Sequence, residues 1–155
     1  MQQIPTEESF SAPRSLKIIC YIFSVILFLT GINLLRIKDV TAEVIFLVPL
    51  IFLIVISMLL YTRLKLIISN VGIRYAGGLK QHNFSWAEVT KVDMARVGKY
   101  QTPIATIYYS NRTLDLHKGF YLQPKFNRIL SLLEMKIDRG LFTEAYQTIR
   151  QQTNP

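Results

Sequence analysis

The hydrophobic pattern begins with two long, uninterrupted apolar runs, at 18–35 and 44–62. Neither run contains a charged residue, and as helices they would extend about 27 Å and about 28 Å, close to the hydrocarbon thickness of a bilayer. Lipid requires each backbone polar group to be bonded within its own segment, which a helix achieves. The all-round hydrophobicity distinguishes these runs from core helices of a soluble protein. The pattern therefore predicts two membrane spans, with Pro49 inside the second.

A cleaved signal peptide is the competing interpretation of the first run. The run is longer than the apolar core of a typical signal peptide, and Glu7 and Glu8 occupy the region that is normally basic. No small-residue cleavage site follows the run. These features favour a retained span.

The connection at 36–43 is long enough to turn but too short to cross the bilayer, so the spans form an antiparallel hairpin with both termini on one side. Two basic residues, Arg36 and Lys38, flank the connection. Four flank the spans on the side of the termini, namely Arg14, Lys17, Arg63 and Lys65. Because basic residues favour the cytoplasmic side, we expect both termini to be cytoplasmic. The chain then divides into a cytoplasmic tail at 1–15, a hairpin at 16–62 and a cytoplasmic domain at 63–155.

The pattern changes after the second span to short alternating segments rich in β-branched residues, separated by turns such as Asn70–Gly72 and Gly77–Gly78. Strands are predicted at 64–69, 73–76, 80–86, 89–96, 103–110 and 113–117. Apolar residues then recur at helical spacing, which predicts helices at 124–138 and 142–151, with Gly140 as the stop of the first. The fold class is therefore α+β: a helical hairpin, then an antiparallel sheet or small β-barrel capped by a C-terminal helix.

The charge of the chain is concentrated in this second part. The 155 residues carry a net charge of +8, with 14 basic and 6 acidic residues from 63 onward and four of each before it. An anionic leaflet attracts each basic residue near its surface by about 1 kcal/mol. The candidates for contact with headgroups are Arg63, Lys65, Arg74 and Lys80. The alternative is that the positive charge only sets the membrane topology.

No catalytic or metal-binding pattern emerges from the polar residues. His82 and His117 lie far apart without a neighbouring ligand, and the glycine pair at 77–78 lacks the lysine of a phosphate-binding loop. Asp93 and Asp115 could act as an acid–base pair, but their spacing equally fits solvated strand positions. We therefore expect no enzyme activity, cofactor or metal.

Two residues in the first span have open interpretations. Cys20 is the single cysteine, which excludes an internal disulfide; near a membrane interface it could be acylated, or it could be a small packing residue. Asn33 could form a hydrogen bond across the hairpin or to a partner helix, or be solvated at the opposite interface.

Three stretches together resemble a known family: 64–78 (LKLIISNVGIRYAGG), 84–92 (FSWAEVTKV) and 119–137 (GFYLQPKFNRILSLLEMKI). The chain looks like bacterial membrane proteins that carry a pleckstrin-homology-like (PH-like) domain behind a two-helix hairpin. The most similar features are Gly72-Ile73 after a strand and the group Trp86, Glu88 and Val89 before the next strand. This resemblance implies a PH-like barrel with a capping helix, an interaction role and a bacterial inner-membrane location.

Eukaryotic phosphoinositide-binding members of that family use two basic residues, one position apart, between their first two strands. This chain has Lys65 and Arg74, with Gly72 in place of the additional basic residue, which disfavours inositol-phosphate binding. The predicted function is a non-enzymatic, membrane-anchored accessory module that binds a protein partner or anionic lipid headgroups. The alternative is an interfacial lipid-handling enzyme or transport component. Membrane tethering and the lack of an RNA-recognition motif disfavour nucleic acid as a partner.

Overall fold

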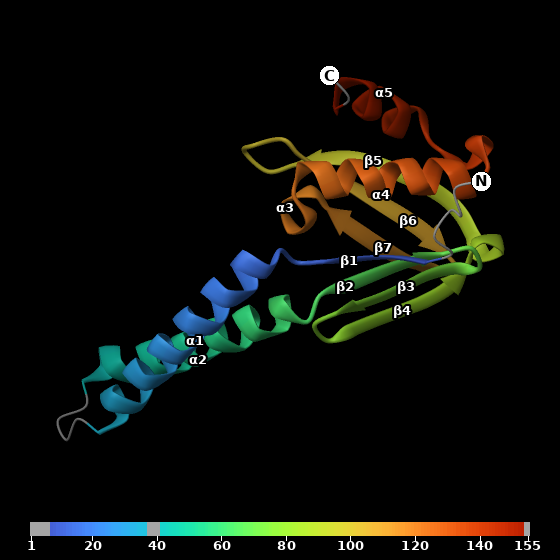
Figure 1. The fold of residues 1–155 in the computed structure, drawn as a ribbon. Coiled ribbons are helices and arrows are strands. Elements are labelled where there is room, and N and C mark those ends of the chain that lie inside the picture. Colours follow the sequence, from blue (N-terminus) through green and yellow to red (C-terminus); the bar gives the residue numbers. More distant parts are fainter. Residues whose placement is uncertain (1–6, 37–40, 154–155) are drawn as a thin grey trace. The chain divides into compact units, whose positions relative to one another are not determined.

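The computed structural model of the chain describes residues 7–36 and 41–153 (Figure 1). Its architecture is mixed α+β: a pair of N-terminal helices, two antiparallel sheets and C-terminal helices. The expected α+β class is confirmed. The sheets are open, so the described residues do not form a closed barrel. The chain divides into a hairpin unit, Ser11–Lys65 with Ala76–Lys80, and a sheet unit, Met1–Phe10 with Leu66–Tyr75 and Gln81–Pro155.

The hairpin unit contains the two apolar runs as helices α1 (Arg14–Leu35) and α2 (Ala42–Thr62). Both helices are long and apolar enough to cross a membrane by length and composition. In the most apolar 18 residues of each helix, 11% of α1 and 22% of α2 are buried. The core helix of a soluble protein would be mostly buried. Large apolar side chains therefore remain exposed around most of both helices.

The two helices pack along a narrow seam of small and aromatic side chains. Ser24 and Gly31, two turns apart on α1, are buried, and a Cβ atom at Gly31 would lie 3.3 Å from the ring of Phe52. Phe28 and Phe52 meet edge to face, with ring centroids 5.7 Å apart. Small residues allow this close approach, as in membrane helix pairs. The antiparallel packing places the start of α1 beside the end of α2.

In the described part of the chain, seven strands form two sheets. The first has the order β1-β2-β3-β4, comprising β1 (Glu7–Ser11), β2 (Lys65–Ser69), β3 (Gly72–Gly77) and β4 (Lys80–Ser85). The second has the order β5-β6-β7, comprising β5 (Val89–Val97), β6 (Thr102–Tyr109) and β7 (Arg112–His117). The six predicted strands are present with small shifts at their ends. The strand β1 was not predicted, because its sequence Glu-Glu-Ser-Phe-Ser buries only Phe10 and shows no hydrophobic alternation.

The core of the sheet unit follows from alternation along these strands. Alternate residues of β6 are buried, and Ile107 lies directly opposite Val92 on β5 and Leu114 on β7. Directly opposed residues share one face of a sheet, so these three side chains form a continuous apolar row. All three are at most 2% exposed.

The C-terminal segment forms more elements than the sequence predicts. The two predicted helices are α4 (Gln123–Lys136) and α5 (Glu144–Thr153), and the additional elements are the short helix α3 (Lys118–Tyr121) and the 3₁₀ turn η2 (Arg139–Leu141). A further 3₁₀ turn, η1 (Trp86–Glu88), lies between β4 and β5. The prediction that Gly140 stops the first long helix is wrong, because α4 ends at Lys136. Ile137 there adopts extended backbone with φ −106°, and Gly140 lies inside η2.

Helix α4 packs into the core of the sheet unit and is bonded to its first strand. Its apolar face is buried, with Phe126, Ile129 and Leu133 fully enclosed. Arg128 forms an ion pair with Glu8 on β1, which raises the pKa of the guanidinium through hydrogen bonding and charge. The first sheet is therefore tied to a helix that is distant in sequence.

Candidate functional site

The basic residues predicted to meet lipid headgroups fall into both units. Arg63 and Lys65 directly follow α2 and are exposed in the hairpin unit. Lys80 belongs to the same unit through the turn between β3 and β4. Arg74 lies on β3 in the sheet unit, so it is not assigned to this group.

The β3–β4 turn lies against the last turns of α2. Gly78 has φ +57°, which suits glycine, and a Cβ atom built there would lie 3.5 Å from the Cβ atom of Leu60. Leu79, at the tip, is 90% exposed and is followed by the exposed Lys80. The glycine pair predicted this turn, but the exposure of Leu79 was not predicted. The sequence signal for it is a large apolar residue between a glycine pair and a lysine.

Five basic residues gather at this end of the hairpin unit. The antiparallel helices bring the first turn of α1 beside the last turn of α2, and the β3–β4 turn adds one more lysine. We call this group the basic end: Arg14, Lys17, Arg63, Lys65 and Lys80. The acidic residues of the unit, Asp39 and Glu43, lie in sequence at the other end of the hairpin, Asp39 between the helices and Glu43 at the second position of α2. The basic end therefore carries positive charge without a nearby carboxylate of its own unit.

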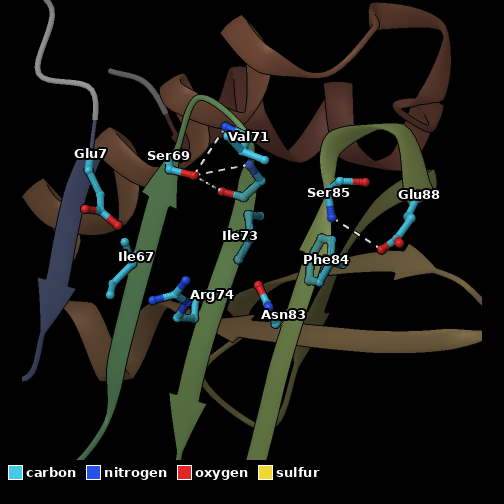
Figure 2. A pocket seen from close by; sticks show the side chains of 11 residues that line it. Glu7, Ile67, Ser69, Val71, Ile73, Arg74, Asn83, Phe84, Ser85 and Glu88 are labelled. Atoms are coloured by element: carbon cyan, nitrogen blue, oxygen red, sulfur yellow. Dashed lines mark hydrogen bonds between the residues drawn. The ribbon is translucent and has the colours of Figure 1, made fainter.

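Arg74 lines a shallow groove of about 310 Å³ on the sheet unit (Figure 2). Figure 2 shows its guanidinium between Ile67 and Asn83, on neighbouring strands. Glu7 and Glu88 also line the groove, so one guanidinium shares it with two carboxylates. This mixed composition makes the groove a weaker anion site than the basic end.

The groove is bordered by two tightly bonded turns. The hydroxyl of Ser69 accepts hydrogen bonds from the N–H groups of Val71 and Gly72, at 3.3 Å and 3.2 Å. Ser85 and Glu88 form a reciprocal capping box around η1. These polar groups are occupied by the local fold, so they serve structure rather than chemistry.

His82 contacts aromatic residues rather than a metal-binding group. Its Nδ1 atom forms a short hydrogen bond with the hydroxyl of Tyr109, and its ring lies 5.8 Å from that of Tyr75. Burial raises the pKa of both tyrosine hydroxyls, an effect that Arg112 partly opposes at Tyr109. The arrangement links β4 to β6 and holds the tyrosines protonated at neutral pH.

Asp93 and Asp115 are not paired as acid and base. Both lie opposite Thr106 on the central strand β6, which separates them by two strand spacings, about 10 Å. Asp115 accepts a hydrogen bond from Thr106 at 2.7 Å. Asp93 instead accepts from the hydroxyl of Thr143, which also accepts from the N–H of Tyr146 at the start of α5. Asp93 is thus an anchor for α5.

The Asp93 anchor predicts a pH-dependent stability. Desolvation opposes ionisation, but hydrogen bonds from Thr143 and the Met94 N–H hold the pKa of Asp93 below its ordinary value. A lowered pKa stabilises the fold above the pKa of the unfolded chain, and this contribution is lost as pH falls through the folded value. Asp93→Asn should lower the free energy of unfolding at neutral pH by about 1 kcal/mol.

The measurement is urea unfolding of the full chain in detergent micelles, monitored by the fluorescence of the single tryptophan, Trp86. The difference between Asp93→Asn and the unmodified chain should shrink as the pH is lowered toward about 3. A difference that stays constant over this range would contradict the anchor role. Glu144→Gln, at an exposed carboxylate in the first turn of α5, is the control.

The remaining candidates show no metal or catalytic grouping. Among residues 7–36 and 41–153 no cluster of three or more histidine, cysteine, aspartate or glutamate side chains could hold a metal. His117 packs near Phe120. Cys20 is a half-buried free thiol, and Asn33 is exposed near the end of α1.

Comparison of the chain with protein-family models, curated proteins and solved structures finds no match. The geometry of the two units must therefore carry any assignment of function.

Proposed function

We propose that this chain is a non-enzymatic, membrane-anchored module that binds anionic lipid headgroups at the cytoplasmic leaflet. Helices α1 and α2 cross the membrane as a hairpin. The basic end contacts the headgroups and the sheet unit is held in the cytoplasm. A PH-like arrangement of the sheet unit is part of the proposal, supported by two open antiparallel sheets followed by amphipathic helices.

The span lengths support the membrane anchor. Helices of 22 and 21 residues extend about 33 Å and about 32 Å, which matches a hydrocarbon core of about 30 Å. Their exposed leucine, isoleucine and phenylalanine side chains would be unfavourable in water. The seam at Ser24 and Gly31 gives the pair a packed interface without needing water to drive it.

The charge asymmetry of the hairpin unit is the single observation that carries the proposal. The basic end has five positive residues and no carboxylate of its own unit. The other end of the hairpin has, in sequence, Arg36 and Lys38 balanced by Asp39 and Glu43. Positive residues favour the cytoplasmic side and are attracted to anionic lipid. The asymmetry thus supports both the orientation and the ligand.

Leu79 adds an apolar contact beside those charges. It projects from a turn that packs against Leu60, two residues before the end of α2. If α2 spans the bilayer, this turn lies at the interface, where an exposed leucine can enter the acyl boundary and Lys80 can meet phosphate. The same residue in water would be an unfavourable exposed side chain.

The test measures how strongly the purified full chain retains phosphatidylglycerol relative to phosphatidylcholine in detergent micelles. The triple variant Arg63→Gln, Lys65→Gln and Lys80→Gln should lose retention by a factor on the order of 100, from about 1 kcal/mol for each charge. A control triple with the same charge change is Lys91→Gln, Arg112→Gln and Arg139→Gln in the sheet unit.

Equal losses in both triples, or no preference of the unmodified chain for phosphatidylglycerol, would contradict the proposal. Chemical conversion of the retained lipid would favour the alternative, an interfacial enzyme. Recovery of a stoichiometric protein partner that displaces the lipid would favour the protein-binding alternative.

A further inference from the structure

The sheet unit carries an exposed apolar group at one end. Tyr100, in the turn between β5 and β6, is 87% exposed, and Val97 at the end of β5 is also exposed. The turn lies beside α3 in Figure 1. The junction of α3 and α4 adds Leu122 and Phe120, whose side chains also reach solvent.

Two of these side chains, those of Tyr100 and Leu122, line the same hollow. A hollow of about 300 Å³ is lined from one side by Tyr100, Thr102 and Pro103, and from the other by Lys118 and Leu122. The two segments are separated by more than a dozen residues in sequence but share this hollow. A single flat partner could therefore contact both.

Leu122 occupies a backbone conformation that leucine rarely adopts. Its φ and ψ of 62° and 158° fall in a region populated almost entirely by glycine. The side chain that this strain positions is 48% exposed, so the isolated fold buries only about half of it. Strained residues of this kind concentrate at functional sites.

The charge around the hollow has one sign. Lys118 lines it, and Lys99 directly precedes Tyr100 in the β5–β6 turn. Arg96 lies opposite Pro103 on β6, and its guanidinium donates a hydrogen bond to Gln152. The segments 94–114 and 116–133 contain no aspartate or glutamate. Asp115, between them, is bonded to Thr106 on the face that bears Asp93.

Short chain segments connect this unit to the two proposed membrane spans. Phe10 precedes the first residue of α1 by four positions, and Leu66 follows the last residue of α2 by four, so each connection spans at most about 14 Å. A surface on a unit tethered this closely meets the bilayer at high effective concentration. Aromatic, aliphatic and lysine side chains together are typical of interfacial membrane contacts.

We infer that the β5–β6 turn and the α3–α4 junction form a second membrane-contact surface, specific for an anionic bilayer. Tyr100 and Leu122 enter the boundary between headgroups and acyl chains, and Lys99 and Lys118 pair with lipid phosphates. We call these four residues the Tyr100 surface. This inference rests on the proposed membrane anchoring and adds a second point of contact, which would fix the orientation of the sheet unit.

The test is a depth measurement with a nitroxide label on the full chain reconstituted in vesicles. In a Cys20→Ser background, single labels are placed at Tyr100→Cys, Leu79→Cys and Val71→Cys. Leu79 reports on the proposed anchoring. Val71, 78% exposed in the β2–β3 turn of the same sheet unit, is the matched control. Vesicles are phosphatidylcholine alone or an equimolar mixture with phosphatidylglycerol.

In the anionic vesicles the label at position 100 should lie about 5–10 Å below the phosphates, with that at position 71 in water. Adding Lys99→Gln and Lys118→Gln should lower the ratio of docked to undocked label about 25-fold. A label at 100 that stays in water while that at 79 is immersed overturns the second surface and leaves the anchoring intact. Equal immersion of the label at position 100 in neutral vesicles also overturns it, and so does burial of that label in native membranes but not in vesicles. The latter result would assign the surface to a protein partner.

Discussion

Gly72→Ala is expected to destabilise the sheet unit by about 4 kcal/mol, at the upper end of the range for single substitutions. A Cβ atom at this position would lie 2.1 Å from the carbonyl oxygen of Phe84 and 2.7 Å from the Cα atom of Ser85. Both neighbours are backbone atoms, so no side-chain rotation can relieve the overlap. Strand β3 would have to move away from β4.

Trp86 makes this loss easy to measure. Its Nε1 atom donates to the carbonyl of Ser69 at 3.0 Å, and its backbone N–H donates to the carbonyl of Val71. Separation of the strands would expose the indole and shift its emission. Gly119→Ala is the control, because nothing lies within 4 Å of a Cβ atom there. A variant Gly72→Ala that unfolds at the same urea concentration as Gly119→Ala would contradict the packing described.

Glu134→Ala is expected to lower the free energy of unfolding by about 3 kcal/mol, because it leaves a largely buried guanidinium without its partner. Arg150 on α5 is 13% exposed and donates from Nε to Glu134 on α4 at 2.8 Å. Tyr146 donates to the same carboxylate at 2.9 Å. Burial and the neighbouring Glu134 charge both raise the pKa of the Tyr146 hydroxyl, so it remains a donor at neutral pH.

A double-mutant cycle separates the ion pair from simple loss of packing. Arg150→Ala removes the cation, so the double variant Glu134→Ala, Arg150→Ala should be less destabilised than the sum of the single variants. Urea unfolding in micelles, read by circular dichroism of the helices, gives the three differences. Additive effects would show that the carboxylate and the guanidinium do not stabilise each other.

The long-range periodicity of the chain made much of the fold predictable. Uncharged runs of 18 and 19 residues have few structural alternatives, and both became helices. The alternating segments from 64 to 117 became strands, because period-two patterns bury one face of a sheet. The resemblance to a PH-like domain remains a proposal, since no related protein was found and the sheets are open.

Elements fixed by tertiary contacts were not predictable. Strand β1 has one buried apolar residue, Phe10, and is held by pairing with β2 and by the bond from Arg128 to Glu8. The end of α4 was placed too late, because Gly140 is a strong local stop signal. The helix instead ends where Ile137 is buried in extended backbone.

The candidate site also combines residues that the sequence predicted with residues that only the tertiary structure revealed. The spacing of charges around the apolar runs predicted Arg63 and Lys65 at the membrane-proximal end. The contribution of Lys80 became a geometric argument only through the contact between Gly78 and Leu60. Leu79 and the Tyr100 surface were missed, because sequence alone does not show which apolar residues of a turn remain exposed.

We propose that α1 and α2 span the membrane with the sheet unit in the cytoplasm. Single cysteines introduced as Thr41→Cys, just before α2, and Thr90→Cys, on β5, test it directly in a Cys20→Ser background. Both positions are exposed. A membrane-impermeant maleimide applied to intact bacterial cells that express the introduced gene should label Thr41→Cys, and should label Thr90→Cys only after the membrane is opened. Labelling of Thr90→Cys from outside, or recovery of the chain in solution without detergent, would contradict a two-span anchor with a cytoplasmic sheet unit.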